Sequence, residues 1–148
     1  MKKIFIASDH AGFELKQVLV SELKKLNLEV HDLGPSDTSS VDYPDYANKV
    51  AESLKEHSNA INHFGVLVCG SGQGMCIRAN KYPYIRAALV YNDEITKLSR
   101  EHNNANIICL GSRFCAAEQA LKWIHIFLNT EFSEGRHSLR VAKIGQPV

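Results

Sequence analysis

The chain has 148 residues, a length that fits one domain over residues 1–148 with a substantial hydrophobic core. Its 17 basic and 16 acidic side chains give a formal charge of +1, which argues against a general affinity for nucleic acid or anionic membranes. The first apolar run is too short for a signal peptide, and no stretch reaches the roughly 18 apolar residues of a membrane helix, so we expect a cytoplasmic protein.

Short β-rich runs alternate with segments of helical period along the chain, the pattern of βαβ units with a parallel sheet. In chain order we expect strands over residues 3–8, 28–33, 65–69, 85–90 and 106–110, and helices over 13–26, 46–55, 95–101 and 116–128. The strands are mostly continuous apolar runs, as expected where helices cover both faces of a sheet. The sequence therefore predicts an α/β fold with a five-stranded parallel sheet.

Ligands of open parallel sheets bind outside the carboxyl ends of the strands. The residues that follow the predicted strands at that edge are Asp9 and His10, Cys69 to Gly74, Tyr91 to Asp93, and Gly111 to Arg113. We expect the functional groups to come from these four segments.

The loop "CGSGQG", from Cys69 to Gly74, alternates glycines with small polar residues, which allows backbone N–H groups to converge on an anion. It differs from a dinucleotide fingerprint, which needs GxGxxG in the first βα turn, and no P-loop string is present. A cysteine phosphatase would carry arginine six residues after the cysteine, where this chain has Met75. The loop therefore predicts an anion site of another kind.

Cys69 stands at the mouth of this loop, and the four cysteines, Cys69, Cys76, Cys109 and Cys115, form no CxxC pair. We expect reduced thiols in a cytosolic chain of this size. A thiolate near a helix N-terminus has a depressed pKa and can take a proton from carbon, while loop N–H groups hold the enolate oxygen. The alternative is that Cys69 is a small buried core residue.

Three further groups are candidates for ligand contacts. Arg136 and Arg140 stand four residues apart, so on a helix they share a face and can bind one phosphate, or they belong to a solvated basic helix. In that helix Leu139 and Ile144 would face the body of the protein, and a tail that cannot reach its own sheet could reach a neighbouring subunit.

His102 ends a predicted helix just before the fifth strand, where it can approach a ligand or simply cap its helix. Asp9 and His10 can point into the crevice, or Asp9 can cap the first helix. The chain has no HExxH motif, no Cys/His cluster and no EF-hand loop, so we predict no metal.

Five motifs in fixed order, "SDHAG", "DYPDYA", "CGSGQGM", "LSREHNNANIICLGSR" and "GRHSLR", resemble those of the ribose/galactose isomerase family, which includes ribose-5-phosphate isomerase B and the galactose-6-phosphate isomerase subunits. The resemblance covers nearly the whole chain and is closest to the ribose 5-phosphate branch. It implies a Rossmann-like three-layer sandwich with a C-terminal helical tail, assembled as a homodimer or a tetramer with sites between subunits.

The activity that this resemblance implies is the interconversion of ribose 5-phosphate and ribulose 5-phosphate in the pentose phosphate pathway, through a cis-enediolate and without metal or cofactor. Cys69 would be the base, Ser71 would help to move the proton between the two oxygens, and His102, with Asp9 nearby, would open the sugar ring. The implied substrate-binding residues are Asp9, His10, Tyr43, Tyr46, Gly70, Ser71, Gly72, Gln73, Gly74, Asn103, Arg113, Arg136 and Arg140. Of these, His10, Arg136 and Arg140 would bind the phosphate.

This sequence departs from some family members at two positions. Members that lack the cysteine use a carboxylate further along the loop, where this chain has Met75, and Ser71 stands where others carry threonine. The thiolate form of the reaction is therefore indicated, and the hydroxyl at position 71 is preserved.

Two alternatives to this interpretation remain open. A six-carbon substrate such as allose or galactose 6-phosphate would share the chemistry and differ in the length of the pocket. A flavodoxin-like or nucleotide-binding module would bind its ligand without needing Cys69, but the dinucleotide fingerprint is missing.

Overall fold

A computed structural model describes all 148 residues. Five parallel strands form one sheet in the order β2-β1-β3-β5-β4. The strands are β1 (Lys2–Ser8), β2 (Leu28–Asp32), β3 (His63–Cys69), β4 (Ala87–Leu89) and β5 (Ile107–Gly111). Each predicted strand is present, and the predicted five-stranded parallel sheet is confirmed.

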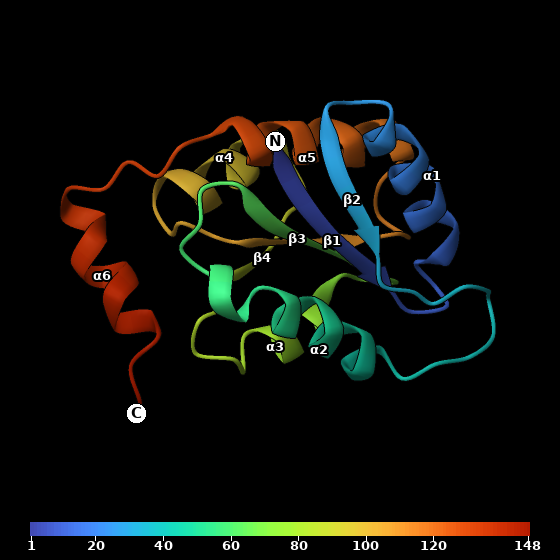
Figure 1. Ribbon diagram of the computed structural model, residues 1–148, viewed down its shortest axis with the longest axis horizontal. Helices are drawn as coiled ribbons and strands as arrows, with labels where there is room; N and C mark the ends of the chain where they lie inside the picture. Colours follow the sequence, from blue (N-terminus) through green and yellow to red (C-terminus); the bar gives the residue numbers. More distant parts are fainter.

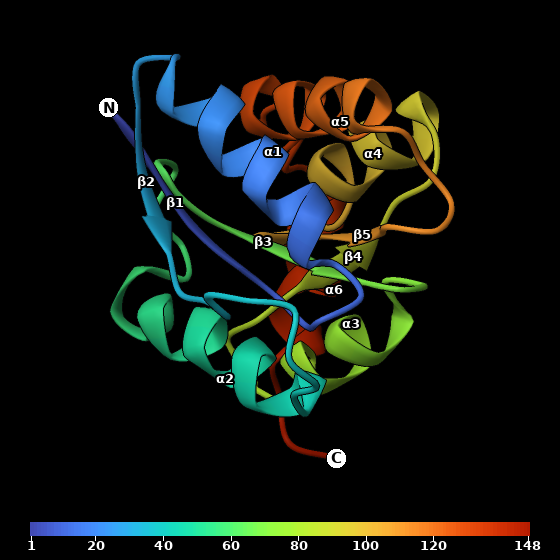
Figure 2. The same cartoon turned by 90° about the vertical axis from the view of Figure 1, so that its right-hand side faces the viewer.

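Helices cover both faces of the sheet and make a three-layer sandwich (Figure 2). One face carries α1 (Phe13–Lys24), α4 (Asp93–Glu101) and α5 (Ala117–Asn129), and the other carries α2 (Tyr43–Ser53), the short turn η1 (Lys55–His57) and α3 (Gln73–Ala79). No helix of the chain is both long enough and apolar enough to cross a membrane.

Two buried clusters fill the spaces between these layers, one of 17 residues under α1, α4 and α5 and one of 12 under α2 and α3. Because successive side chains of a strand point to opposite faces, Val66 and Val68 join the first cluster while Leu67 and Cys69 join the second. The alternation therefore turns the Cys69 side chain toward the layer that contains α3.

The strand order places β1 between β2 and β3, so the connections that leave β1 and β3 diverge at that point. Such a switch point opens a crevice at the carboxyl ends of the two strands. The register pairs Ser8 with Val68, and the next residues along the two strands are Asp9 and Cys69. The fold itself therefore sets these two residues side by side.

Helix α4 starts after β4 and returns to the start of β5, so it runs antiparallel to the strands. The residue that follows it, His102, consequently lies at the amino edge of the sheet, opposite the Cys69 loop. The helix that the sequence places at the C-terminus, α6 (Arg136–Ile144), stands off the body on this same side (Figure 1). We call residues 130–148 the arm.

The arm makes few contacts with its own chain. None of the residues of α6 is buried, and the Ser133 N–H donates to the Glu101 carbonyl at 3.0 Å near the start of the arm. Leu139 is 67 % exposed and Ile144 is 52 % exposed, so the prediction that they face the body of the protein is wrong for a single chain. An amphipathic pattern shows that a helix needs an apolar partner, but it does not show which chain supplies it.

Candidate functional site

The loop after β3 has a backbone shape that only glycine adopts without strain. Gly72 has φ +77°, and a Cβ there would lie 2.6 Å from Leu89 Cδ1 and 2.9 Å from the Leu110 carbonyl carbon. The loop is also tied to the end of β5, because the Ser112 N–H donates to the Cys69 carbonyl at 2.8 Å and the Arg113 N–H to that of Gly70 at 3.1 Å. The loop is therefore held firmly against the neighbouring strand.

Several N–H groups of this loop have no protein acceptor, among them those of Ser71 and Gly72. The Gln73 N–H donates to Ser71 Oγ at 3.3 Å, but no protein acceptor takes the N–H of Ser71 or Gly72. Unpaired donors at a strand-to-helix turn suit an oxyanion. The loop thus offers N–H donors for the anion site that the glycine pattern predicts.

Cys69 lies at the end of β3 and is 4 % exposed. It packs in the same layer as Cys76 and Cys109, and all four cysteines of the chain are free thiols. Burial, with smaller effects of Cys76 and Cys69, raises the pKa of the Cys109 thiol well above its usual value, so Cys109 stays protonated. Cys69 is the thiol of this layer that adjoins the glycine loop.

Asp9 and His10 complete the switch-point crevice. Asp9 is 8 % exposed, and its Oδ1 accepts the Gly12 N–H at 2.9 Å, so the carboxylate holds the turn before α1, whose N-cap is Gly12 and not Asp9. His10 is exposed, and its Nδ1 accepts the Val41 N–H at 3.2 Å. A neutral His10 therefore carries its proton on Nε2, which is left to donate to a ligand.

Tyr43 and Arg113 cover the glycine loop from two sides. A Cβ on Gly74 would lie 2.8 Å from the ring of Tyr43, and one on Gly70 would lie 3.2 Å from the Arg113 guanidinium. Tyr46 instead packs with Lys49 and lies against Gly34, whose Cβ would come within 3.0 Å of its ring. The structure thus brings Tyr43 and Arg113 to the loop, while these contacts of Tyr46 lie elsewhere.

The remaining predicted residues gather at the amino edge of the sheet. The His102 ring stacks on that of His137 with centroids 4.2 Å apart and an interplanar angle of 15°. Asn103, Arg136 and Arg140 are exposed. Partial burial, followed by the charges of His102 and the two arginines, lowers the pKa of His137 below its usual value.

One chain therefore holds two half-sites at opposite edges of its sheet. We call the group around Cys69 the loop half-site and the group around His102 the arm half-site. The expectation that Asp9 lies near His102 is not met within one chain, because α4 carries His102 to the far edge. A site with both halves needs a second copy.

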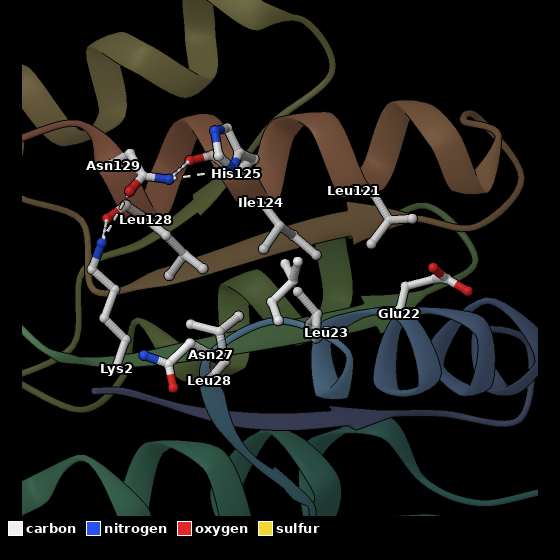
Figure 3. Close-up of a pocket in the computed structure, with 11 residues that line it drawn as sticks. Lys2, Glu22, Leu23, Asn27, Leu28, Leu121, Ile124, His125, Leu128 and Asn129 are labelled. Carbon is white, nitrogen blue, oxygen red and sulfur yellow. Dashed lines mark hydrogen bonds between the residues drawn. The ribbon is translucent and has the colours of Figure 1, made fainter.

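One cavity of the chain lies apart from both half-sites. A cavity of about 430 Å³ opens between α1 and α5 at the amino edge, with Leu23, Leu28, Ile124 and Leu128 in its lining (Figure 3). Lys2 closes one end by donating to the Leu128 carbonyl at 2.6 Å. None of the predicted site residues belongs to this lining.

A second cavity of about 270 Å³ borders the loop half-site, with Ser71, Gln73 and Gly111 among its lining residues. The side chains of the chain form no group of three or more His, Cys, Asp or Glu residues that could hold a metal ion.

Sequence reasoning missed two buried cations. Lys16 is fully buried and its Nζ donates to both oxygens of Asp32 at 2.8 Å, which fixes the end of β2 to α1. Arg100 is 6 % exposed in the last turn of α4. A charged residue on an amphipathic helix normally marks the solvent face, so the sequence offers no signal for either burial.

The chain is similar to known proteins along almost its whole length. The ribose/galactose isomerase family matches residues 4–144. A probable ribose-5-phosphate isomerase B of Mycoplasma pneumoniae is 44 % identical over 95 % of this chain and 91 % of its own. The crystal structure of a ribose 5-phosphate isomerase from Thermotoga maritima superposes with a TM-score of 0.93 at 47 % identity, covering 97 % of each chain.

A third relative carries a ligand. The ribose-5-phosphate isomerase B of Mycoplasma genitalium, whose crystal structure has ribulose-5-phosphate bound, superposes with a TM-score of 0.91 at 43 % identity, covering 96 % of this chain and 93 % of that one. The matches span almost the full length of both partners and include both half-sites. The chain therefore belongs to the ribose/galactose isomerase family.

Proposed function

We propose that the chain is an aldose-ketose isomerase that interconverts ribose 5-phosphate and ribulose 5-phosphate through a cis-enediolate. The observation that carries this proposal is the switch-point crevice, where Cys69 adjoins Asp9 and a glycine loop with unpaired N–H donors. Relatives that match almost the whole chain are ribose-5-phosphate isomerases, and one of them binds ribulose-5-phosphate. We also propose that the protein is cytosolic, as expected from the sequence, and that it acts in the pentose phosphate pathway.

In the proposed reaction, the Cys69 thiolate takes the proton from C2 of the open-chain aldose, and the electron pair of that C–H bond forms the C1–C2 double bond. The carbonyl electrons move to O1, and the N–H groups of Ser71 and Gly72 stabilise the developing charge. The Ser71 hydroxyl helps to carry the proton of O2 to O1. Cys69 then returns its proton to C1, and the C2 carbonyl of the ketose forms.

Opening the furanose ring requires a proton taken from O1 and one given to the ring oxygen. We assign this step to His102 of a second copy, because His102 of the same chain lies at the far edge of the sheet. A two-fold arrangement gives each loop half-site the arm half-site of its partner, and so makes two equivalent sites per dimer. The apolar residues Leu139 and Ile144 support such an arrangement, because more than half of each is exposed in a single chain.

The phosphate would bind between the two half-sites. The arm half-site brings Arg136 and Arg140, one turn apart on α6 and both exposed. His10 adds its Nε2–H from the loop half-site, and Arg113 and Asn103 assist. Guanidinium groups that bind one phosphate together give both charge and geometric fit.

The test is the formation of ribulose 5-phosphate from ribose 5-phosphate by the purified chain, in the presence of a chelator. Allose 6-phosphate and galactose 6-phosphate are assayed beside it at the same concentrations. We expect preference for the pentose and no effect of the chelator. Preference for a hexose phosphate would keep the chemistry and change the substrate, and no turnover of any of the three would refute the proposal.

A further inference from the structure

The environment of Arg100 is unusual for an arginine. Its side chain lies outside both half-sites, two residues before His102, and no carboxylate forms an ion pair with it. The guanidinium lies 5.2 Å from the ring centroid of Phe64 and 5.5 Å from that of Phe127. A buried cation without an acid partner is costly unless neutral acceptors surround it, and here they do.

These acceptors belong to the turn that follows α4. Nη1 donates to the Ala105 carbonyl at 2.6 Å and to Asn104 Oδ1 at 2.9 Å. The carbonyl of Arg100 in turn accepts the Asn104 N–H at 3.1 Å. The backbone and the side chain of Arg100 therefore hold Asn104 from two sides.

The turn closed in this way carries His102 and Asn103, the two arm half-site residues that are not on α6. Asn104 has φ +46°, a left-handed conformation that Asn tolerates better than most residues, and its N–H returns to the carbonyl four residues earlier. A turn of this kind fixes the direction of the two residues before it. The hydrogen bonds of Arg100 thus bear directly on where His102 points.

The same guanidinium also reaches the first residue of the arm. Nε donates to the Thr130 carbonyl at 3.2 Å, where α5 ends and the segment that leads to α6 begins. Arg100 accordingly joins the His102 turn to the origin of the arm with one rigid planar group. A lysine has a single ammonium and cannot make this set of bonds.

We infer that Arg100 is a positioning residue for ring opening, which sets the His102 turn relative to the arm without touching the sugar. The inference rests on the proposed function, because it takes His102 as the group that opens the ring. Under this inference Arg100 affects ring opening but not the transfer of the proton between C2 and C1, which is assigned to the loop half-site of the partner chain.

Ribulose 5-phosphate distinguishes the two steps. Its C5 hydroxyl is phosphorylated, so it has no furanose form and reaches Cys69 already open, whereas ribose 5-phosphate is almost entirely cyclic. A defect in ring opening lowers kcat for the aldose more than kcat for the ketose, because open-chain ribose 5-phosphate formed from the ketose can leave the site and close its ring in solution. A general loss of structure slows both.

The experiment compares Arg100→Lys, Asn104→Ala and Asn104→Asp with the wild type in both directions. We expect Arg100→Lys and Asn104→Ala to lower kcat for ribose 5-phosphate by about tenfold or more, with a much smaller loss for ribulose 5-phosphate. Asn104→Asp keeps the acceptor for Nη1 and restores most of the aldose rate. If Arg100→Lys does not fold, the two Asn104 variants still decide the question.

Leu19→Ala is the control for stability, because Leu19 is fully buried in the same cluster as Phe64 and Phe127 but lies in α1. It should lower the melting temperature and leave the ratio of the two rates unchanged. Equal losses in both directions for the Arg100 and Asn104 variants, or no loss at all, would overturn the inference. A wild-type chain that turns over neither pentose phosphate would instead refute the proposed function.

Discussion

The rings of His102 and His137 lie face to face, with centroids 4.2 Å apart, although one belongs to the turn after α4 and the other to the arm. This contact brings the proposed ring-opening group next to Arg136 and Arg140, which flank His137 on α6. The arm half-site is therefore a structural unit within one chain. In the proposed dimer it would contact the loop half-site of the partner chain.

Cys69→Ala should abolish isomerisation and leave substrate binding almost intact, because the proposed base and the phosphate contacts lie on different elements. We expect kcat to fall by at least about 100-fold, the scale on which a positioned base contributes. Kinetics and calorimetric titration with ribulose 5-phosphate measure the two effects. Cys115→Ala is the matched control, since Cys115 is a half-buried thiol outside the proposed machinery, and normal turnover by Cys69→Ala would show that the thiol is not the base.

Mixing two inactive variants tests whether the site crosses between chains. Cys69→Ala and His102→Ala are each expected to be inactive, but a mixed dimer has one site with both wild-type residues. Random re-association at equal amounts should therefore restore about a quarter of the wild-type rate. If the site lay within one chain, every chain in the mixture would still lack one group, and no activity would return.

Arg140→Ala should weaken binding of the sugar phosphate more than it slows the reaction. Loss of one charge-assisted hydrogen bond corresponds to an increase in KM of about 10- to 100-fold at similar kcat. Lys143→Ala is the control, since Lys143 is an exposed cation of the same helix that we have not assigned to the phosphate. An unchanged KM for Arg140→Ala would show that Arg140 does not bind the phosphate.

Gly72→Ala should damage the loop more than the same change at Gly135. Both glycines have positive φ, +77° and +57°, but a Cβ at Gly72 meets backbone and side-chain atoms within 3 Å, whereas one at Gly135 meets none. The left-handed conformation alone costs about 1–3 kcal/mol for a residue with a side chain. The free energy of unfolding, measured with denaturant, should fall by about that amount for Gly135→Ala and by more for Gly72→Ala. Equal losses would mean that the loop around Gly72 can shift to make room for a Cβ.

The pKa of His137 should depend on His102. Partial burial is the first cause of its lowered pKa, and the charges of His102, Arg136 and Arg140 add to it. A histidine with a lowered pKa in the folded state binds fewer protons than in the unfolded state, so its contribution to stability is present above the unfolded pKa and is lost as the pH falls. In His102→Ala, the NMR titration midpoint of His137 should rise toward the usual value of about 6.5, and an unchanged midpoint would contradict the proposed coupling.

The sequence predicts the loop half-site well, because its signal is local. Glycines around Cys69 and polar residues directly after the first strand can be read without the fold, and the carboxyl edge of a parallel sheet unites them. The arm half-site is harder to place. Its residues are grouped only through the family resemblance, and the direction of α4 decides that His102 lies on the far edge.

Two features lie beyond what the sequence can show. The amphipathic pattern of the last helix predicts an apolar face, yet Leu139 and Ile144 are more than half exposed in their own chain. The periodicity carries no information about which chain covers such a face. The burial of Arg100 depends on carbonyl groups that come together only after folding, so charge patterning suggests solvent instead.

The arm bears on how the activity depends on protein concentration. Helix α6 has 9 residues and none of them is buried, and a helix of this length is marginal alone, so in the proposed dimer the partner chain would help to stabilise it. Mass action then links catalysis to assembly: as the protein is diluted below the dissociation constant of the dimer, the rate per chain should fall with the fraction associated. If the proposed dimer forms the site, the specific activity of this protein is also a measure of self-association.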